Sequence, residues 1–183
     1  IVGLLFVGVV WHYHRTLNSV LSDYHDLQKY EVRKSLALEI EIELAAVRDD
    51  PDAVAPAVEE LLRWLSIVHS AIPRITTTAV EVAGVTIPAG ELVLVSLASG
   101  NRDPALVDHP ETLDITRGAL GHLAFGHGVH HCLGAPLARM EMRIAFPALL
   151  RRFPRLALAE PFEQVDFRSF HFIYGLRSLE VSW

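Results

Sequence analysis

The stretch "FGHGVHHCLG", residues 125–134, contains the only cysteine of the chain, beside two histidines and between glycines. A thiolate in apolar surroundings is unstable unless backbone N–H groups and a cation stabilise it. Gly128 and Gly134 let the backbone fold close to the sulfur, because glycine tolerates positive φ and has no Cβ. A helix that we predict from Pro136 onward adds the positive end of its dipole just downstream of Cys132. The loop therefore favours an anionic sulfur held as a metal ligand.

Three other hypotheses apply to a lone cysteine in such a stretch. It could be a small buried hydrophobe, which is the ordinary role of a free cysteine. It could be a nucleophile paired with a histidine, although catalytic partners usually meet through the fold and not as sequence neighbours. It could also belong to a zinc site, but ligands this close in sequence are crowded for tetrahedral geometry. That zinc site would use His127, His130, His131 and Cys132.

The composition limits the classes of function. The chain has 183 residues, of which 51% are hydrophobic, enough for one domain with a sizeable core. A formal net charge of -6 argues against nucleic acid as a partner. A single cysteine excludes an internal disulfide and suits a reducing compartment, so we expect a cytoplasmic protein.

The N-terminal segment is unusual. The chain begins with Ile1 and the apolar run "IVGLLFVGVVW". This run is shorter than the roughly 20 residues that span a bilayer. It also has no basic segment before it and no small-residue cleavage site, as a signal peptide would have. We interpret the chain as a fragment or as one with an unusual start, and we expect no membrane partner.

Hydrophobic patterning predicts a mainly α protein with small β-sheets, an α+β fold. Residues 11–43 have a helical pattern, and a short amphipathic helix over 57–65 follows a loop that contains Pro51. Residues 76–99 alternate as a hairpin and a further strand, and the tail from Pro154 has short strand-like pieces. Proline-punctuated coil covers 101–123, and a helix covers 136–153 with a kink at Pro147.

The cysteine stretch resembles the haem-binding loop of the cytochromes P-450. That family's pattern is Phe, two free positions, Gly, one free position, Arg or His, one free position, Cys, one free position and Gly. Its fixed positions are filled here by Phe125, Gly128, His130, Cys132 and Gly134, and the helix entry "APLAR" follows. Residues 44–183 resemble the C-terminal, haem-binding part of the fold in bacterial, actinomycete-type members. Residues 1–43 are unassigned and do not resemble the family.

A second motif supports the resemblance. "EELLR" supplies Glu60 and Arg63 three residues apart, on one face of a helix where a bidentate ion pair can form. Alone, such a pair is usually a solvated surface feature. The motif resembles the family's Glu-x-x-Arg pair, which an Arg from the following coil completes, and "LDITR" offers Arg117. The resemblance gives these residues a structural role, and in "GNRDP" Arg102 and Asp103 are expected to hold the coil.

The resemblance also implies a haem site. Cys132 would be the catalytic thiolate ligand of the iron of haem b. Phe125 would shield the Fe–S bond, and His130 and Arg74 would pair with the haem propionates, although Arg74 could be a plain surface charge at a strand end. Stretches 66–72 and 170–173 would line the substrate pocket. The expected cofactor-binding residues are Arg74, Phe125, Gly126, Gly128, His130, Cys132 and Gly134.

The implied function is that of a haem-thiolate monooxygenase. It would insert one oxygen atom of O2 into a small organic substrate, with electrons from NAD(P)H through a ferredoxin-type donor. The family's distal Ala/Gly-Gly-x-Asp/Glu-Thr element should fall near Tyr24–Asp26, and it is absent from "SDYHDLQ". The alternative is therefore a truncated, non-catalytic haem-binding remnant. A basic face for the donor is expected from Arg139, Arg143, Arg151 and Arg152.

Overall fold

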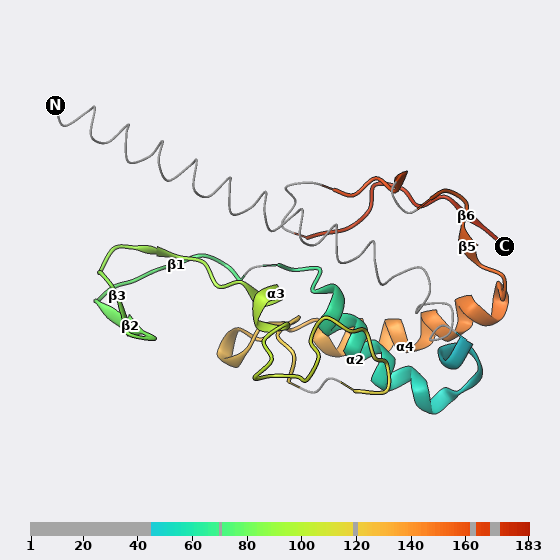
Figure 1. Ribbon diagram of the computed structural model, residues 1–183, viewed down its shortest axis with the longest axis horizontal. Coiled ribbons are helices and arrows are strands. Elements are labelled where there is room, and N and C mark those ends of the chain that lie inside the picture. The colour runs from blue at the N-terminus through green and yellow to red at the C-terminus, as the bar shows by residue number, and fades with distance from the viewer. Residues whose placement is uncertain (1–44, 70, 119–120, 162–163, 169–172) are drawn as a thin grey trace. The chain divides into compact units, whose positions relative to one another are not determined.

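The computed structural model describes residues 45–69, 71–118, 121–161, 164–168 and 173–183 (Figure 1). All of them belong to one compact unit, Glu41–Trp183. The helix expected over 11–43 lies outside the described residues, and residues 45–49 are helical. The further elements are η1 Pro51–Ala53, α2 Val54–Leu65, β1 Arg74–Ile75, β2 Val80–Val82, β3 Val85–Ile87, β4 Leu92–Val93, α3 Leu97–Gly100, η2 Gly128–His130, α4 Ala135–Arg152, β5 Ala157–Leu158 and β6 Val181–Ser182.

Helix α2 begins earlier than the predicted 57–65, because a capped turn precedes it. The Asp50 side chain accepts a hydrogen bond from the Asp52 N–H at 2.9 Å, and η1 leads directly into the helix. The helix ends at Ser66, whose φ of 42° is left-handed and whose hydroxyl donates to the Arg63 carbonyl at 2.6 Å. α2 buries apolar residues on one side, but Glu59 is also buried. Its polar side is therefore not a solvated surface.

Helix α4 packs against α2, and the core lies between them. One apolar cluster joins Val58 and Leu62 of α2 to Ala124, with Phe125 and Phe146 packed against it. A second cluster contains Val47, Val54, Ala57, Ile115 and Leu150. α4 opens with proline in its first turn, as predicted, and Pro147 lies inside it without ending it. The two helices thus hold the loop that leads into α4 (Figure 1).

The strands form small antiparallel sheets, and together with the helices they confirm the predicted fold class. β2 pairs with β3, β1 with β4, and β5 with β6, and each of these sheets has two strands. Ala83 and Gly84 turn the β2–β3 hairpin with φ of 50° and 79°, the left-handed pair that a tight two-residue turn requires. The predicted hairpin at Gly84 is therefore correct.

The segment between α3 and η2 is irregular, as its prolines predict. Residues 101–118 run through turns and bends. The four-residue helix α3 was not predicted, because residues 92–99 read as a continuing strand. The Ser96 hydroxyl accepts from the Ser99 N–H at 3.2 Å and caps α3. None of the helices described in the structure is long and apolar enough to cross a membrane.

Candidate functional site

The loop that carries Cys132 is closed by its own backbone. The Cys132 N–H donates to the Phe125 carbonyl at 2.9 Å, and the Gly126 N–H donates to the Leu123 carbonyl at 2.9 Å. Gly126 and Gly128 have φ of 74° and 72°, in the left-handed region that favours glycine. The Ala135 N–H donates to the Cys132 carbonyl at 3.2 Å, which joins the loop to the start of α4. The cysteine thus sits at a fixed turn directly before a long helix.

Several apolar side chains in and after the cysteine loop are exposed. Cys132 itself is exposed. In the same loop, Val129 and Leu133 are 97% and 99% exposed. Leu137, Met140 and Ile144 are also exposed and follow one another at helical spacing on α4. Exposed apolar residues gathered on one helix face are a common mark of a binding surface.

The expected partners of the propionates do not meet Cys132 through any contact described in the structure. Arg74 lies in β1, is exposed, and donates from Nη1 to the Ile72 carbonyl at 3.2 Å. His130 ends η2 and is exposed. Among the described residues, no group of three or more His, Cys, Asp or Glu side chains is placed to hold a metal ion. The zinc hypothesis therefore has no geometric support there.

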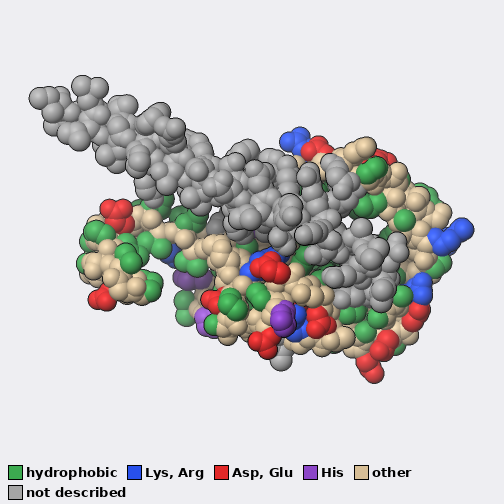
Figure 2. Space-filling view, viewed as in Figure 1, with side chains coloured by type: hydrophobic (Ala, Val, Ile, Leu, Met, Phe, Trp, Pro, Cys, Tyr) green, Lys and Arg blue, Asp and Glu red, His purple; other side chains and the backbone are tan. Residues whose placement is uncertain are grey.

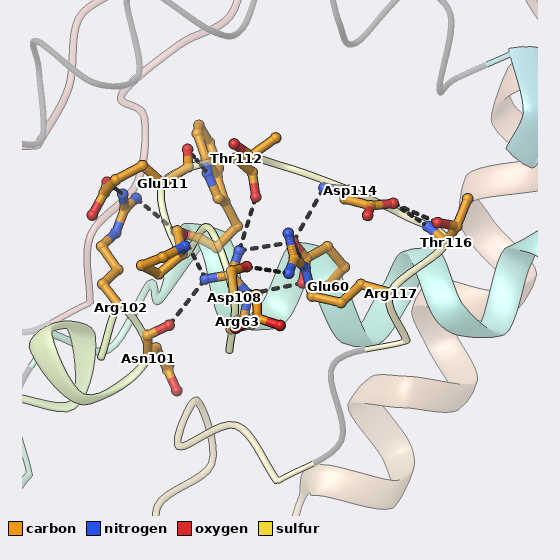
Figure 3. Close-up of polar contacts among 12 residues, drawn as sticks. Glu60, Arg63, Asn101, Arg102, Asp108, Glu111, Thr112, Asp114, Thr116 and Arg117 are labelled. Atoms are coloured by element: carbon orange, nitrogen blue, oxygen red, sulfur yellow. Dashed lines mark hydrogen bonds and ion pairs between the residues drawn. The ribbon is translucent and has the colours of Figure 1, made fainter. Parts of the chain in front are cut away.

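The structure brings Glu60, Arg63 and Arg117 together (Figure 3). The Arg63 guanidinium binds the Glu60 carboxylate at two points, Nε to Oε2 at 2.8 Å and Nη2 to Oε1 at 2.7 Å. Both residues have 0% exposure. Arg117 Nε lies 3.3 Å from Glu60 Oε1, an ion pair without hydrogen-bond geometry, and Arg117 Nη1 donates to the Asp108 carbonyl. The Glu60–Arg63 ion pair is therefore buried and is not a surface contact.

The same pair ties α2 to the irregular segment (Figure 3). Arg63 Nη1 donates to the carbonyls of Asn101 and Pro110, both at 2.9 Å, and Nη2 donates to that of Thr112 at 3.2 Å. All five guanidinium N–H groups thus have an acceptor. The Asp114 N–H donates to Glu60 Oε1 at 3.2 Å. The buried charges thus tie the backbone of the coil to α2, in addition to the buried Leu113 and Ile115.

Asn101 is a site residue that the sequence analysis missed. Its side chain is fully buried, donates from Nδ2 to the Ser66 hydroxyl at 2.8 Å, and accepts from the Leu123 N–H through Oδ1. It therefore joins the end of α2 to the start of the cysteine loop. Its neighbour Arg102 donates to the Trp64 carbonyl at 3.2 Å and pairs with Glu111. Asn101 belongs to the "GNRDP" motif, in which the two charged residues, Arg102 and Asp103, were the ones expected to hold the coil.

A second buried carboxylate, Glu59, corrects the expected basic face. Arg139 Nε lies 2.8 Å from Glu59 Oε1 and Nη2 lies 3.0 Å from Oε2, and Arg143 Nη2 lies 3.2 Å from Oε1. Arg139 is thus paired inside the fold, whereas Arg143 shares the same single carboxylate and its side chain stays 44% exposed. Of the four expected cations, Arg151 and Arg152 in the last turn of α4 have no ion pair described in the structure. In Figure 2, blue Lys and Arg side chains lie apart from one another on the right-hand side of the view, where α4 ends in Figure 1, with red Asp and Glu side chains below them.

His122 completes the Glu59 cluster. Its Nε2 lies 3.1 Å from Glu59 Oε2, and its Nδ1 accepts from the Ala124 N–H at 3.2 Å. Burial lowers the pKa of His122 more than the Glu59 carboxylate raises it. Burial raises the pKa of Glu59, but the hydrogen bonds from Arg139 and His122 outweigh it, so this pKa lies below its usual range. The cluster contains a neutral histidine and an ionised carboxylate.

The two stretches expected to line a substrate pocket lie side by side. Val68 pairs with Ile173 in an antiparallel bridge, and the Tyr174 N–H donates to the Ile67 carbonyl at 2.7 Å. Residues 70 and 170–172 of these stretches are outside the described residues, as is the segment around Tyr24–Asp26.

Comparison with known proteins agrees with the loop motif. The pattern of the family described as "Cytochrome P450" matches residues 54–167. "Cytochrome P450 FAS1" of Rhodococcoides fascians is 56% identical over 139 residues, which is 76% of this chain and 35% of that protein. "Cytochrome P450 monooxygenase PikC" of Streptomyces venezuelae is 48% identical over 142 residues, 77% of this chain and 34% of that protein. The chain spans about a third of the length of these relatives.

A solved structure shows the same fold. The crystal structure of cytochrome P450 MoxA from Nonomuraea recticatena is 49% identical and superposes with a TM-score of 0.73, covering 76% of this chain and 35% of that one. The described unit therefore has part of the cytochrome P450 fold. The resemblance inferred from the cysteine loop is confirmed.

Removing the Glu60 carboxylate should unfold much of the unit. Glu60→Ala leaves Arg63 as a buried, unpaired charge, which costs on the order of 3–5 kcal/mol. Glu111→Ala is the matched control, because the Glu111 side chain is 57% exposed in its pair with Arg102. That variant should lose less than about 1 kcal/mol. Urea denaturation measures the free energy of unfolding of both variants. An equal loss of stability in Glu60→Ala and Glu111→Ala would show the Glu60 pair to be no more than a surface contact.

The Glu59–His122 pair should make stability depend on pH. Both groups have folded pKa values below their ordinary values of 4.5 and 6.5, so the stability they add is complete above pH 6.5 and is lost as the pH falls. We expect the free energy of unfolding to drop between pH 7 and pH 5. His122→Gln should flatten that slope, whereas His109→Asn, at an exposed histidine, should leave it unchanged. A slope unaltered by His122→Gln would contradict the assignment.

Proposed function

The chain belongs to the cytochrome P450 family, and on that premise we propose that it carries the haem-thiolate site of a monooxygenase. The reaction would insert one oxygen atom of O2 into a small organic substrate, with electrons from NAD(P)H. The observation that carries the proposal is the exposed Cys132 thiol at a closed turn, in a loop whose Val129 and Leu133 are also exposed. Thiolate-bound haem, when present, supplies the activation of dioxygen.

Cys132 would hold the iron through its sulfur, which must be deprotonated to do so. It stands before the 18-residue helix α4, whose N-terminus at Ala135 carries the positive end of the helix dipole. A Cβ added at Gly134 would lie 3.7 Å from the sulfur, an ordinary van der Waals contact.

The remaining loop residues would bind and shield the macrocycle. Val129 and Leu133 offer the apolar surface that a porphyrin ring needs. Phe125 would cover the iron–sulfur bond from the side of the protein core, against which its ring packs. His130 and Arg74 are proposed to pair with the propionates. Gly126 and Gly128 would let the backbone pass close to the ring, since neither carries a side chain.

The partners follow from the remaining charged and apolar surfaces. We propose that Arg143, Arg151 and Arg152 receive an acidic ferredoxin-type donor, since Arg139 is the one of the four expected cations that pairs with both oxygens of Glu59. The substrate would be a small organic molecule that contacts the paired stretches at Val68 and Ile173. The single free cysteine suits a cytoplasmic location.

Replacing Cys132 tests the ligand directly. After reconstitution with haem, the reduced, carbon-monoxide-bound chain should show the absorption band of thiolate-ligated haem. Cys132→Ser should abolish this band, because the hydroxyl does not ionise near neutral pH. His127→Ala is the matched control and should keep it, since position 127 is a free one in the loop pattern. Persistence of the band in Cys132→Ser would exclude Cys132 as the ligand.

A second function is favoured by the sequence near Tyr24–Asp26. The proton-guiding element that the family carries is absent from "SDYHDLQ", and oxygen activation requires delivered protons and a site that excludes bulk water. A haem-binding protein without coupled oxygen activation would have this property. The two candidates share the thiolate ligand and differ only in turnover.

Turnover of the reconstituted chain separates the two candidates. The chain is supplied with haem, a ferredoxin, its reductase, NADPH and a fluorogenic alkyl aryl ether whose dealkylation reports oxygen insertion. If the distal element is lacking, we expect most NADPH to end as peroxide and little as product, because ordered proton delivery and the exclusion of bulk water would both be missing. Product that nearly matches the NADPH consumed would reject the second function.

A further inference from the structure

We propose that Glu59, Arg139 and His122 form a clamp that positions Phe125 and, through it, the Cys132 loop. The three residues come from α2, α4 and the segment before the loop, so the clamp joins separate parts of the fold. Its consequence for haem rests on the function proposed above, but its effect on the loop does not. Glu59 and Glu60 are sequence neighbours that bind different parts of the fold. Glu60 accepts from the Asp114 N–H and pairs with Arg63, which donates to the Asn101 carbonyl. Glu59 binds Arg139 of α4.

The clamp is built on a bidentate ion pair. Arg139 binds both carboxylate oxygens of Glu59, with Nε at 2.8 Å from Oε1 and Nη2 at 3.0 Å from Oε2. Glu59 is 8% exposed, so water screens this pair much less than a surface pair. The fork of the guanidinium thus fixes the plane of the Arg139 head group relative to α2.

The Arg139 guanidinium lies over the ring of Phe125. The Arg139 guanidinium carbon lies 4.8 Å from the ring centroid, within the range of a cation–π contact. The opposite constraint on Phe125 comes from its backbone, because its carbonyl accepts the Cys132 N–H at 2.9 Å. Any shift of the Phe125 ring is therefore transmitted to the hydrogen bond that closes the loop. Phe125 is the link between the clamp and the cysteine.

His122 is the third member of the clamp and contacts the backbone just before Phe125. Because the Ala124 N–H donates to Nδ1, that nitrogen is the acceptor and Nε2 carries the proton that it donates to Glu59. The bond to Ala124 fixes the residue directly before Phe125. The His122 and Phe125 ring centroids are 6.2 Å apart. One carboxylate thus orients both groups that flank the phenylalanine.

The test measures amide hydrogen exchange at Cys132 in the full chain, without haem. Arg139→Lys keeps the charge but loses the fork and the planar face over Phe125. We expect it to raise the exchange rate of the Cys132 amide about two- to fivefold, the size of a lost exposed cation–π contact. Amides of the β2–β3 hairpin in the same molecule should not change. Arg155→Gln, at an exposed arginine outside the clamp, is the matched control and should alter neither set of amides.

The outcomes separate positioning from general stabilisation. An equal rise at Cys132 and in the hairpin would show that Arg139 only stabilises the fold, and no rise at Cys132 would show that it does not act on the loop. Either result overturns the clamp. In a Phe125→Leu background, Arg139→Lys should have no further effect on Cys132, because the ring that transmits the change is gone. If Arg139→Lys still acts there, Phe125 is not the link.

A second measurement connects the clamp to the thiolate. With haem bound, Arg139→Lys and Glu59→Gln should raise the fraction of the carbon-monoxide complex that lacks the thiolate band, because a loosened loop presents the sulfur less firmly. A parent chain that binds no haem would contradict the proposed function and leave the exchange result standing. An exchange result at Cys132 as expected, with an unchanged thiolate fraction, would confine the clamp to the loop and overturn its link to haem.

Discussion

The buried pair of Glu60 and Arg63 is the interaction on which the rest of the unit depends. Taking two charges out of water is expensive, and their mutual attraction offsets this only when every remaining donor is satisfied. Here the donors that the carboxylate does not use reach the carbonyls of Asn101, Pro110 and Thr112. The pair therefore stabilises the fold only while the coil stays in place, which makes the charge and the path of the coil interdependent.

The cysteine loop is held from two directions as a result. On one side, Asn101 is fixed through its carbonyl by Arg63, and its side chain accepts the Leu123 N–H that precedes the loop. On the other side, Glu59 holds Arg139 on the helix that follows the loop. Two adjacent acids of α2 thus set the start and the end of the same short segment. This arrangement gives an exposed thiol a fixed position without burying it.

Local sequence patterns predicted some contacts of this fold and missed others. Glu60 and Arg63 could be paired from sequence because they lie three residues apart on one helix, and the resemblance of the loop identified Cys132. The Glu59–Arg139 pair could not be predicted from the sequence, because its two residues are 80 positions apart. Arg139 and Arg143 therefore looked like a free basic face, although both contact the carboxylate of Glu59, which compensates one of their two charges. Hydrophobic periodicity likewise gives no sign that Glu59 is buried.

The amino-acid sequence by itself determined the family, the fold class, the hairpin at Gly84 and the loop with Cys132. Those features depend on residue types at fixed short spacings, where backbone sterics and helical periodicity act directly. Only the tertiary structure decided which charges are buried, which nitrogen of His122 accepts, and how Asn101 and Phe125 connect the coil to the loop. The reason is physical: burial and hydrogen-bond partnership arise between segments far apart in the chain, and no local pattern encodes which segments will meet.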